Sequence, residues 1–76
     1  MELQEFIENV ADQFEDTDRS EFTADTKIME LDEWTSLIAL SVISMIDEEY
    51  DVAIKGSDVK GISTISELYE LVKSKM

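Results

Sequence analysis

The longest helical pattern of the chain runs from residue 35 to residue 50 and reads TSLIALSVISMIDEEY. One face of this segment is apolar at helical spacing, and we expect that face to be buried. Its members are Ala39, Val42, Ile43, Ile46 and Tyr50. The segment therefore predicts an amphipathic helix that begins at Thr35 or Ser36 and ends at Tyr50.

The same helix carries more apolar surface than one contact with a core requires. Leu37, Ile38 and Met45 fall outside its expected buried face, and Leu40 lies at the border of that face. Two explanations are open. Either a loop residue such as Trp34 covers the excess, or the excess forms a surface that receives a protein partner.

Further helices are predicted on both sides of this segment. Residues 3–14 hold one apolar stripe of roughly three and a half turns. The stripe consists of Leu3, Phe6, Ile7, Val10, Ala11 and Phe14. On the other side, Thr64 and Glu67 form a capping box that begins a last helix. The expected inward face of that helix consists of Ile65, Leu68, Tyr69, Val72 and Met76.

The connections between these helices differ in length. Residues 15–34 form a long polar stretch that its apolar members can attach to a core: Phe22, Ile28, Met29, Leu31 and Trp34. Between Gly56 and Gly61 we expect a short helical turn capped by Ser57 or Asp58. The sequence predicts an all-α bundle of three principal helices plus one short helix, with a long loop between the first two. Residues 1–76 are expected to form a single domain.

The charge of the chain excludes several classes of partner. Its 19 acidic and 6 basic residues give a net charge of −13, whereas binding to nucleic acid or to anionic lipid needs positive charge. The longest apolar run, residues 37–40, is far too short to span a membrane. The opening MELQE lacks the basic start of a secretion signal. We therefore expect a cytoplasmic protein.

The sequence gives little support for enzyme activity or for metal binding. The chain has no Cys and no His, which removes the usual zinc ligands and the Ser-His arrangement. The segment from Asp16 resembles the opening of a calcium loop, but Glu21 stands where Gly is needed and Lys27 where a bidentate Glu is needed. We expect no specific metal site and no enzyme activity.

Ser36 stands where the long helix begins. The first turn of a helix offers unpaired N–H groups and a partial positive charge, which suit a phosphate attached to that side chain. Serine is also simply common at helix starts. Position alone therefore leaves both interpretations open.

Four motifs, in order, resemble the acyl carrier proteins, a family modified with 4′-phosphopantetheine. The first is LDEWTSL at residues 31–37, which is similar to the family's Asp-Ser-Leu at the head of the second helix. The others are EEY at 48–50, VAI at 52–54 and ISTI at 62–65. The resemblance covers essentially the whole chain and implies the small helical bundle of that family.

By this resemblance Ser36 is the attachment point of 4′-phosphopantetheine, which a separate phosphopantetheinyl transferase loads from coenzyme A. The arm would carry acyl groups as thioesters, and a chain without Cys offers no competing thiol. Basic patches of acyl-carrier synthases, ketosynthases or acyltransferases would meet the second helix. The implied partner surface consists of Leu37, Ile38, Leu40, Ser41, Ser44, Met45, Asp47 and Glu48. We expect the carrier to be a monomer.

Three departures from the family pattern bear on the pathway. Thr35 stands where Asp is usual, although it can still cap the helix. Glu33-Trp34 replaces a dipeptide that commonly contains Gly. Ile38 and Ser41 stand where carriers of fatty-acid synthesis often have acids, so the partner surface has lost charge. These departures favour a specialised fatty-acid or polyketide-type pathway.

Other interpretations of the sequence stay open. Aminoacyl and D-alanyl carriers are close relatives that these residues do not exclude. Outside the family, the chain fits an unmodified acidic helical module for protein interaction. An acidic protein that buffers cations is a more distant alternative.

Overall fold

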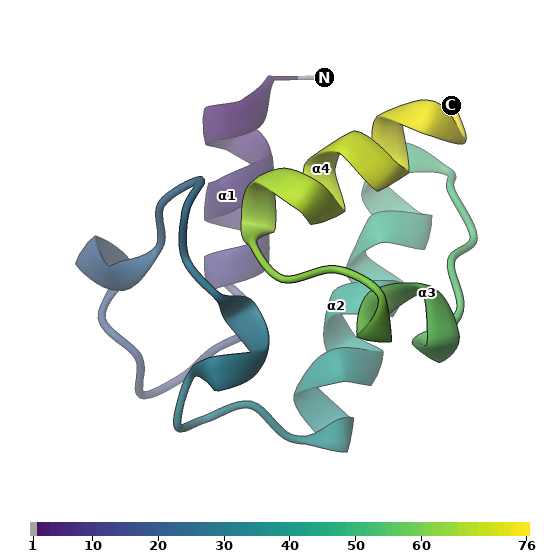
Figure 1. Ribbon diagram of the computed structural model, residues 1–76. Coiled ribbons are helices and arrows are strands. Elements are labelled where there is room, and N and C mark those ends of the chain that lie inside the picture. The colour runs from purple at the N-terminus through teal and green to yellow at the C-terminus, as the bar shows by residue number, and fades with distance from the viewer. Residues whose placement is uncertain (1) are drawn as a thin grey trace.

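The computed structural model of the protein describes residues 2–76 and shows a helical bundle (Figure 1). Its helices are α1 (Leu3–Ala11), α2 (Ser36–Tyr50), α3 (Gly56–Lys60) and α4 (Ile65–Ser74). Two 3-10 turns, η1 (Arg19–Glu21) and η2 (Ile28–Glu30), lie in the long loop between α1 and α2. The described residues form no strand, only an isolated bridge between Lys27 and Thr64. The predicted all-α bundle of three longer helices and one short helix is confirmed.

The core draws on all four helices, on the long loop and on the segment between α2 and α3. The largest fully buried side chains are Phe6, Val10, Ile28, Val42, Ile46, Ile65, Leu68 and Val72. The centroid of the Phe6 ring lies 5.7 Å from the centroid of the Tyr50 ring and 5.6 Å from that of the Tyr69 ring. Removing these apolar groups from water is the main force that holds the three longer helices together.

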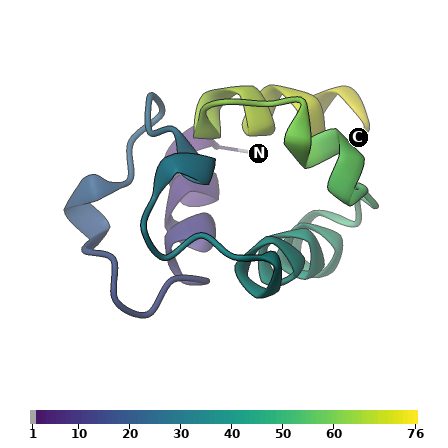
Figure 2. The same cartoon turned by 60° about the horizontal axis from the view of Figure 1, so that its bottom comes forward.

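The long loop is attached to the bundle by its apolar side chains and by its carbonyl groups. Phe22 and Ile28 are buried. The N–H groups of Ile65 and Ser66, in the first turn of α4, donate to the carbonyls of Thr26 (3.0 Å) and Ala24 (2.9 Å). Such N–H groups have no partner within their own helix. Figure 2 shows the loop beside α1 and the start of α4.

Two helices end earlier than their apolar stripes predict. Helix α1 stops at Ala11, because the N–H groups of Gln13 and Phe14 donate three residues back, which tightens the chain into a turn. Phe14 is nevertheless buried. Helix α4 stops at Ser74, and Met76, expected on the inward face, is 66% exposed because it lies past that end.

The predicted caps are largely confirmed. The Thr64 hydroxyl accepts from the Glu67 N–H (3.2 Å), while the Glu67 carboxylate accepts from the Ser63 N–H (2.7 Å), one residue before the predicted donor. At α3 the Asp58 carboxylate accepts from the Lys55 N–H at 3.0 Å. Ser57 therefore does not cap this helix, which begins at Gly56.

Candidate functional site

Ser36 is the first residue of α2 and is exposed to solvent. The preceding Thr35 is extended, and its hydroxyl accepts from the Ile38 N–H at 3.2 Å. The Thr35 carbonyl accepts from the Ala39 N–H at 2.9 Å, which closes the first helical turn. The predicted start of the helix is thus confirmed, and Thr35 caps it without the Asp that is usual in the family.

The carboxylate of Glu33 attaches the end of the long loop to its beginning. One oxygen accepts from the Thr17 hydroxyl (2.7 Å), the Thr17 N–H (2.9 Å) and the Asp16 N–H (3.1 Å). The other accepts from the Glu15 N–H at 2.7 Å. The hydrogen bond from the Thr17 hydroxyl is the main cause that lowers the pKa of Glu33 below its ordinary value. We call this arrangement the Glu33 clasp.

The sequence showed Glu33 only as a departure from the family's dipeptide. The clasp depends on residues 16 to 18 positions away in the chain, so no local pattern predicts it. The only available signal was an acid at a position where the family commonly has a Gly-containing dipeptide.

Trp34 is half-buried against the core and belongs to an aromatic row. Its ring stacks on Phe14, with centroids 6.4 Å apart and an angle of 26° between the planes. Phe14 in turn contacts Phe22, with 5.0 Å between the centroids of the two rings. Trp34 does not cover all the apolar excess of α2, because Leu37 and Leu40 are 76% and 59% exposed.

Beside Ser36 lies a pocket of about 590 Å³ between the long loop, α2 and α3, here called the α2–α3 pocket. Its volume is within the range usual for small-molecule sites, about 300–1,000 Å³. The lining consists of Met29, Trp34, Thr35, Ser36, Ala39, Leu40, Ile43, Gly56, Val59 and Lys60. Most of these side chains are apolar, and Lys60 is the one charged residue among them.

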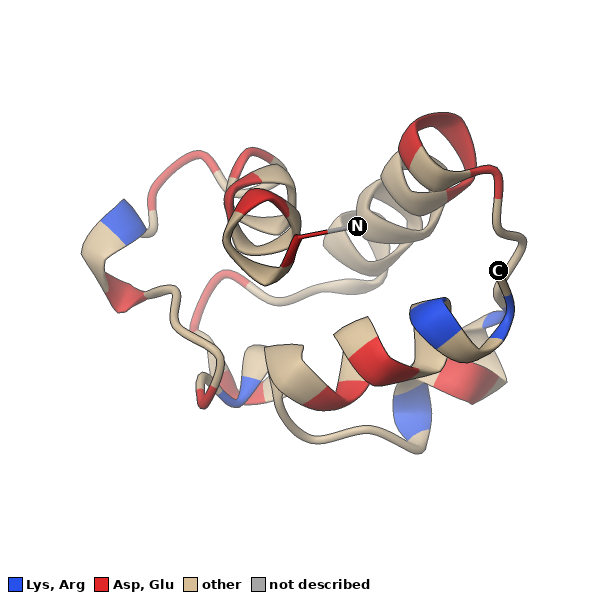
Figure 3. Ribbon diagram, turned by 90° about the horizontal axis from the view of Figure 1, so that it is seen from above, with Lys and Arg blue, Asp and Glu red and all other residues tan. Residues whose placement is uncertain are grey.

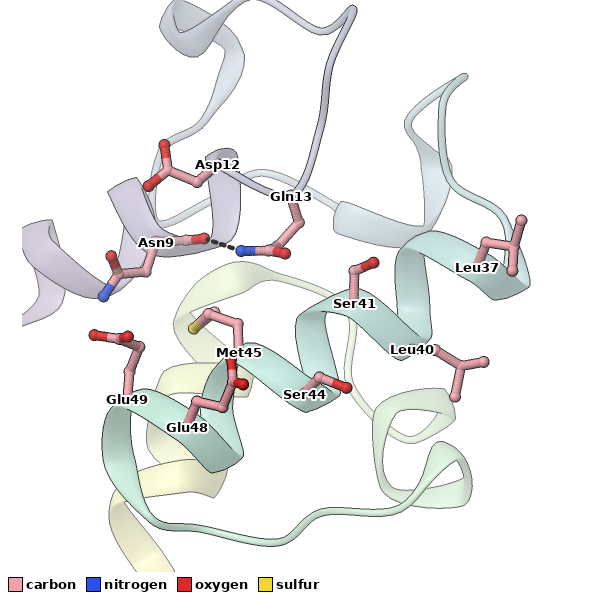
Figure 4. A pocket seen from close by; sticks show the side chains of 10 residues that line it. All are labelled: Asn9, Asp12, Gln13, Leu37, Leu40, Ser41, Ser44, Met45, Glu48 and Glu49. Carbon is pink, nitrogen blue, oxygen red and sulfur yellow. Dashed lines mark hydrogen bonds between the residues drawn. The ribbon is translucent and has the colours of Figure 1, made fainter.

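A second hollow, the α1–α2 groove, lies on another side of α2 (Figure 4). It has a volume of about 540 Å³ and is lined by Asn9, Asp12, Gln13, Leu37, Leu40, Ser41, Ser44, Met45, Glu48 and Glu49. Six residues of the implied partner surface line it, whereas Ile38 and Asp47 do not. The groove residues Asn9, from α1, and Asp12 and Gln13, from the turn that follows α1, were not predicted.

Two members of the implied partner surface are not freely exposed. Met45, expected outside the buried face, is only 6% exposed, so that expectation is wrong. The reason is that α1 packs against α2, and Met45 points into the space between them (Figure 4). Ile38 is half-buried against the core. Leu37, Leu40, Ser41, Ser44, Asp47 and Glu48 are exposed.

The expected buried face of α2 is only partly confirmed. Val42 and Ile46 are fully buried. Ala39, Ile43 and Tyr50 are half-buried. Ala39 and Ile43 face the α2–α3 pocket, and the Tyr50 hydroxyl accepts from Asn9 at 2.8 Å. Partial burial raises the pKa of Tyr50.

Charge is unevenly distributed over the molecule. Figure 3 shows acidic residues on α1, in the long loop, at the end of α2 and on α4, and lysines around α3 and the end of α4. Helix α2 has no acid in its first turn, unlike α1, α3 and α4. A phosphate on the Ser36 hydroxyl would therefore meet the positive end of the helix dipole and no acid of that turn. These residues fit such a group.

Residues 2–76 contain no helix that is long and apolar enough to cross a membrane. Within the same part of the chain, no three or more acidic, His or Cys side chains are grouped so that they could hold a metal ion.

A family model described as a phosphopantetheine attachment site matches residues 4–72. The matched range runs from the first turn of α1 to near the end of α4, and so includes Ser36 and both hollows. Comparison with curated proteins found no match.

Proposed function

Since the chain belongs to the phosphopantetheine attachment-site family, whose members carry 4′-phosphopantetheine covalently, we propose that Ser36 is the residue that carries it. The observation that supports this most directly is the exposed Ser36 at the head of α2, beside an apolar pocket. The chain has no His, so the base that takes the Ser36 proton would come from the transferase.

We propose that the cargo is an acyl group held as a thioester, in a specialised fatty-acid or polyketide-type pathway. The apolar lining of the α2–α3 pocket supports an apolar acyl group over a polar aminoacyl group. On this proposal the protein is a cytoplasmic monomer of one domain, and its partners perform the catalysis.

The proposed partner surface is the exposed part of α2 that borders the α1–α2 groove. Leu37 and Leu40 offer apolar contact at one end, and Glu48 offers negative charge at the other (Figure 4). With a net charge of −13, the protein would attract partners that carry basic patches. Association with a transferase or ketosynthase should therefore slow as salt is added.

A mass measurement tests the attachment. The purified protein is incubated with coenzyme A, Mg²⁺ and a transferase of broad specificity, and the intact protein is then weighed. We expect a gain of one phosphopantetheinyl group in the wild type and no gain in Ser36→Ala. Ser74→Ala, at the end of α4, is the matched control and should gain the group. No gain with several transferases would instead support the unmodified interaction module.

A further inference from the structure

Trp34 lies where the aromatic row meets the α2–α3 pocket. It is two residues before Ser36, lines the same pocket and is the only Trp of the chain. The ring is held by its stack on Phe14, which is itself 6% exposed and in contact with Phe22. Trp34 is therefore a large, supported surface at the side of the pocket where Ser36 lies.

The Glu33 clasp restrains the backbone next to Trp34. Its four hydrogen bonds attach residue 33 to residues 15–17, which directly follow Phe14. The clasp and the ring stack therefore join the same two stretches of chain. Glu33 binds residues 15–17, and the next residue, Trp34, stacks on Phe14. A ring held at two points loses little further freedom when a ligand packs against it, so the contact costs little conformational entropy.

We propose that Trp34 is the specificity-determining wall of the α2–α3 pocket, and that Glu33 is its positioning residue. An apolar acyl group attached through Ser36 contacts the indole, which shields the thioester from water. Acyl groups long enough to pack on the ring are retained in the pocket, and short ones are not. This inference rests on the proposed function.

The size and rigidity of the Trp34 side chain explain why the pocket would select long acyl groups over short ones. An indole offers a large apolar surface with few rotatable bonds. The other apolar side chains of the lining are smaller and not aromatic: Met29, Ala39, Leu40, Ile43 and Val59. An acetyl group is too short to cover this surface, whereas a decanoyl chain can remove much of it from water. The pocket therefore distinguishes cargo by apolar area.

The test compares how fast hydroxylamine cleaves acetyl and decanoyl thioesters on the intact protein, loaded by a transferase from the two acyl-coenzyme A compounds. In the wild type we expect the decanoyl thioester to be cleaved about fivefold more slowly than the acetyl thioester. In Trp34→Ala the two rates should become nearly equal. Trp34→Phe, which keeps a ring, should retain part of the difference and serves if the Ala variant does not fold.

Phe22→Leu is the matched control, because it disturbs the same aromatic row from a position that does not line the pocket. We expect it to keep the wild-type ratio of rates. The fluorescence of Trp34 gives a second readout in the wild type and in Phe22→Leu. The wavelength of its emission maximum should shift when the protein carries a decanoyl group but not when it carries an acetyl group.

For Glu33 the readout is how well the Trp34 ring is protected from a quencher in solution. In the unloaded Glu33→Gln variant, acrylamide should quench the Trp34 fluorescence more strongly than in the wild type, and Glu33→Asp should restore part of the protection. Unchanged quenching would overturn the positioning role of Glu33.

The outcomes separate this inference from the proposed function. Failure of Ser36 to gain mass overturns both. Two outcomes would overturn the role of Trp34 and leave the attachment at Ser36 intact. In the first, the protein gains mass but the acetyl and decanoyl thioesters of the wild type are cleaved at equal rates. In the second, both Trp34 variants keep the wild-type ratio of the two cleavage rates. A loss of the ratio in Phe22→Leu as well would show that a loosened core, and not the wall, governs cleavage.

Discussion

Replacing Thr35 by Ala should lower the stability of the protein by a predictable amount. The change removes the hydroxyl that accepts from the Ile38 N–H (3.2 Å) and leaves that donor without its partner at the head of α2. Loss of such a cap costs typically about 1 kcal/mol of unfolding free energy. In a domain of this size, a loss of that magnitude lowers the melting temperature by about 4–8 °C.

Thermal and urea unfolding, followed by circular dichroism, measure the effect. Thr35→Ser keeps the acceptor and should unfold like the wild type. Thr64→Ala removes an equal cap (3.2 Å) from α4 and is the matched control. The two caps share no hydrogen-bond partner, so the double variant should lose about 2 kcal/mol. A Thr35→Ala protein as stable as the wild type, beside a destabilised Thr64→Ala, would refute the reasoning.

Other perturbations test the clasp, the faces of α2 and the net charge. Because the pKa of Glu33 is lowered, the stability that it contributes is present above its ordinary pKa of 4.5 and is lost as the pH falls through the lower folded value. The melting temperature of the wild type should therefore fall more steeply below pH 4.5 than that of Glu33→Gln. Met45→Ala should cost about 2–5 kcal/mol in urea unfolding, whereas Leu40→Ala should stay within about 0.5 kcal/mol. Added salt should raise the melting temperature, since it screens the charge of −13, and a constant value would contradict this.

Helix α2 lies between the two hollows, and a different side of the helix borders each one. One side, with Ala39 and Ile43, borders the α2–α3 pocket where Ser36 lies. Another side, with Ser41 and Ser44, borders the α1–α2 groove, and Leu40 lines both. In the proposed carrier, cargo and partner would therefore use different sides of one helix, with Leu40 between them.

Much of the fold could be predicted because its signals are local. Helical periodicity located all three longer helices, and the caps at Thr35 and Thr64 marked two of their starts within one residue. Ends were predicted less well, since an apolar residue such as Phe14 can enter the core from a turn as well as from a helix. Met45 was misplaced because the position of α1 determines whether it is covered.

The amino-acid order by itself determined the helices and the position of Ser36 at a helix head, because these depend on residues within about four positions of one another. The acidic character follows from the composition alone. Only the tertiary structure decided which apolar side chains of α2 remain exposed, where the two hollows lie and what Glu33 binds. Those features require segments far apart in the chain to meet. The Glu33 clasp spans 16 to 18 positions and the Asn9 contact with Tyr50 spans 41, distances over which no periodic pattern carries information.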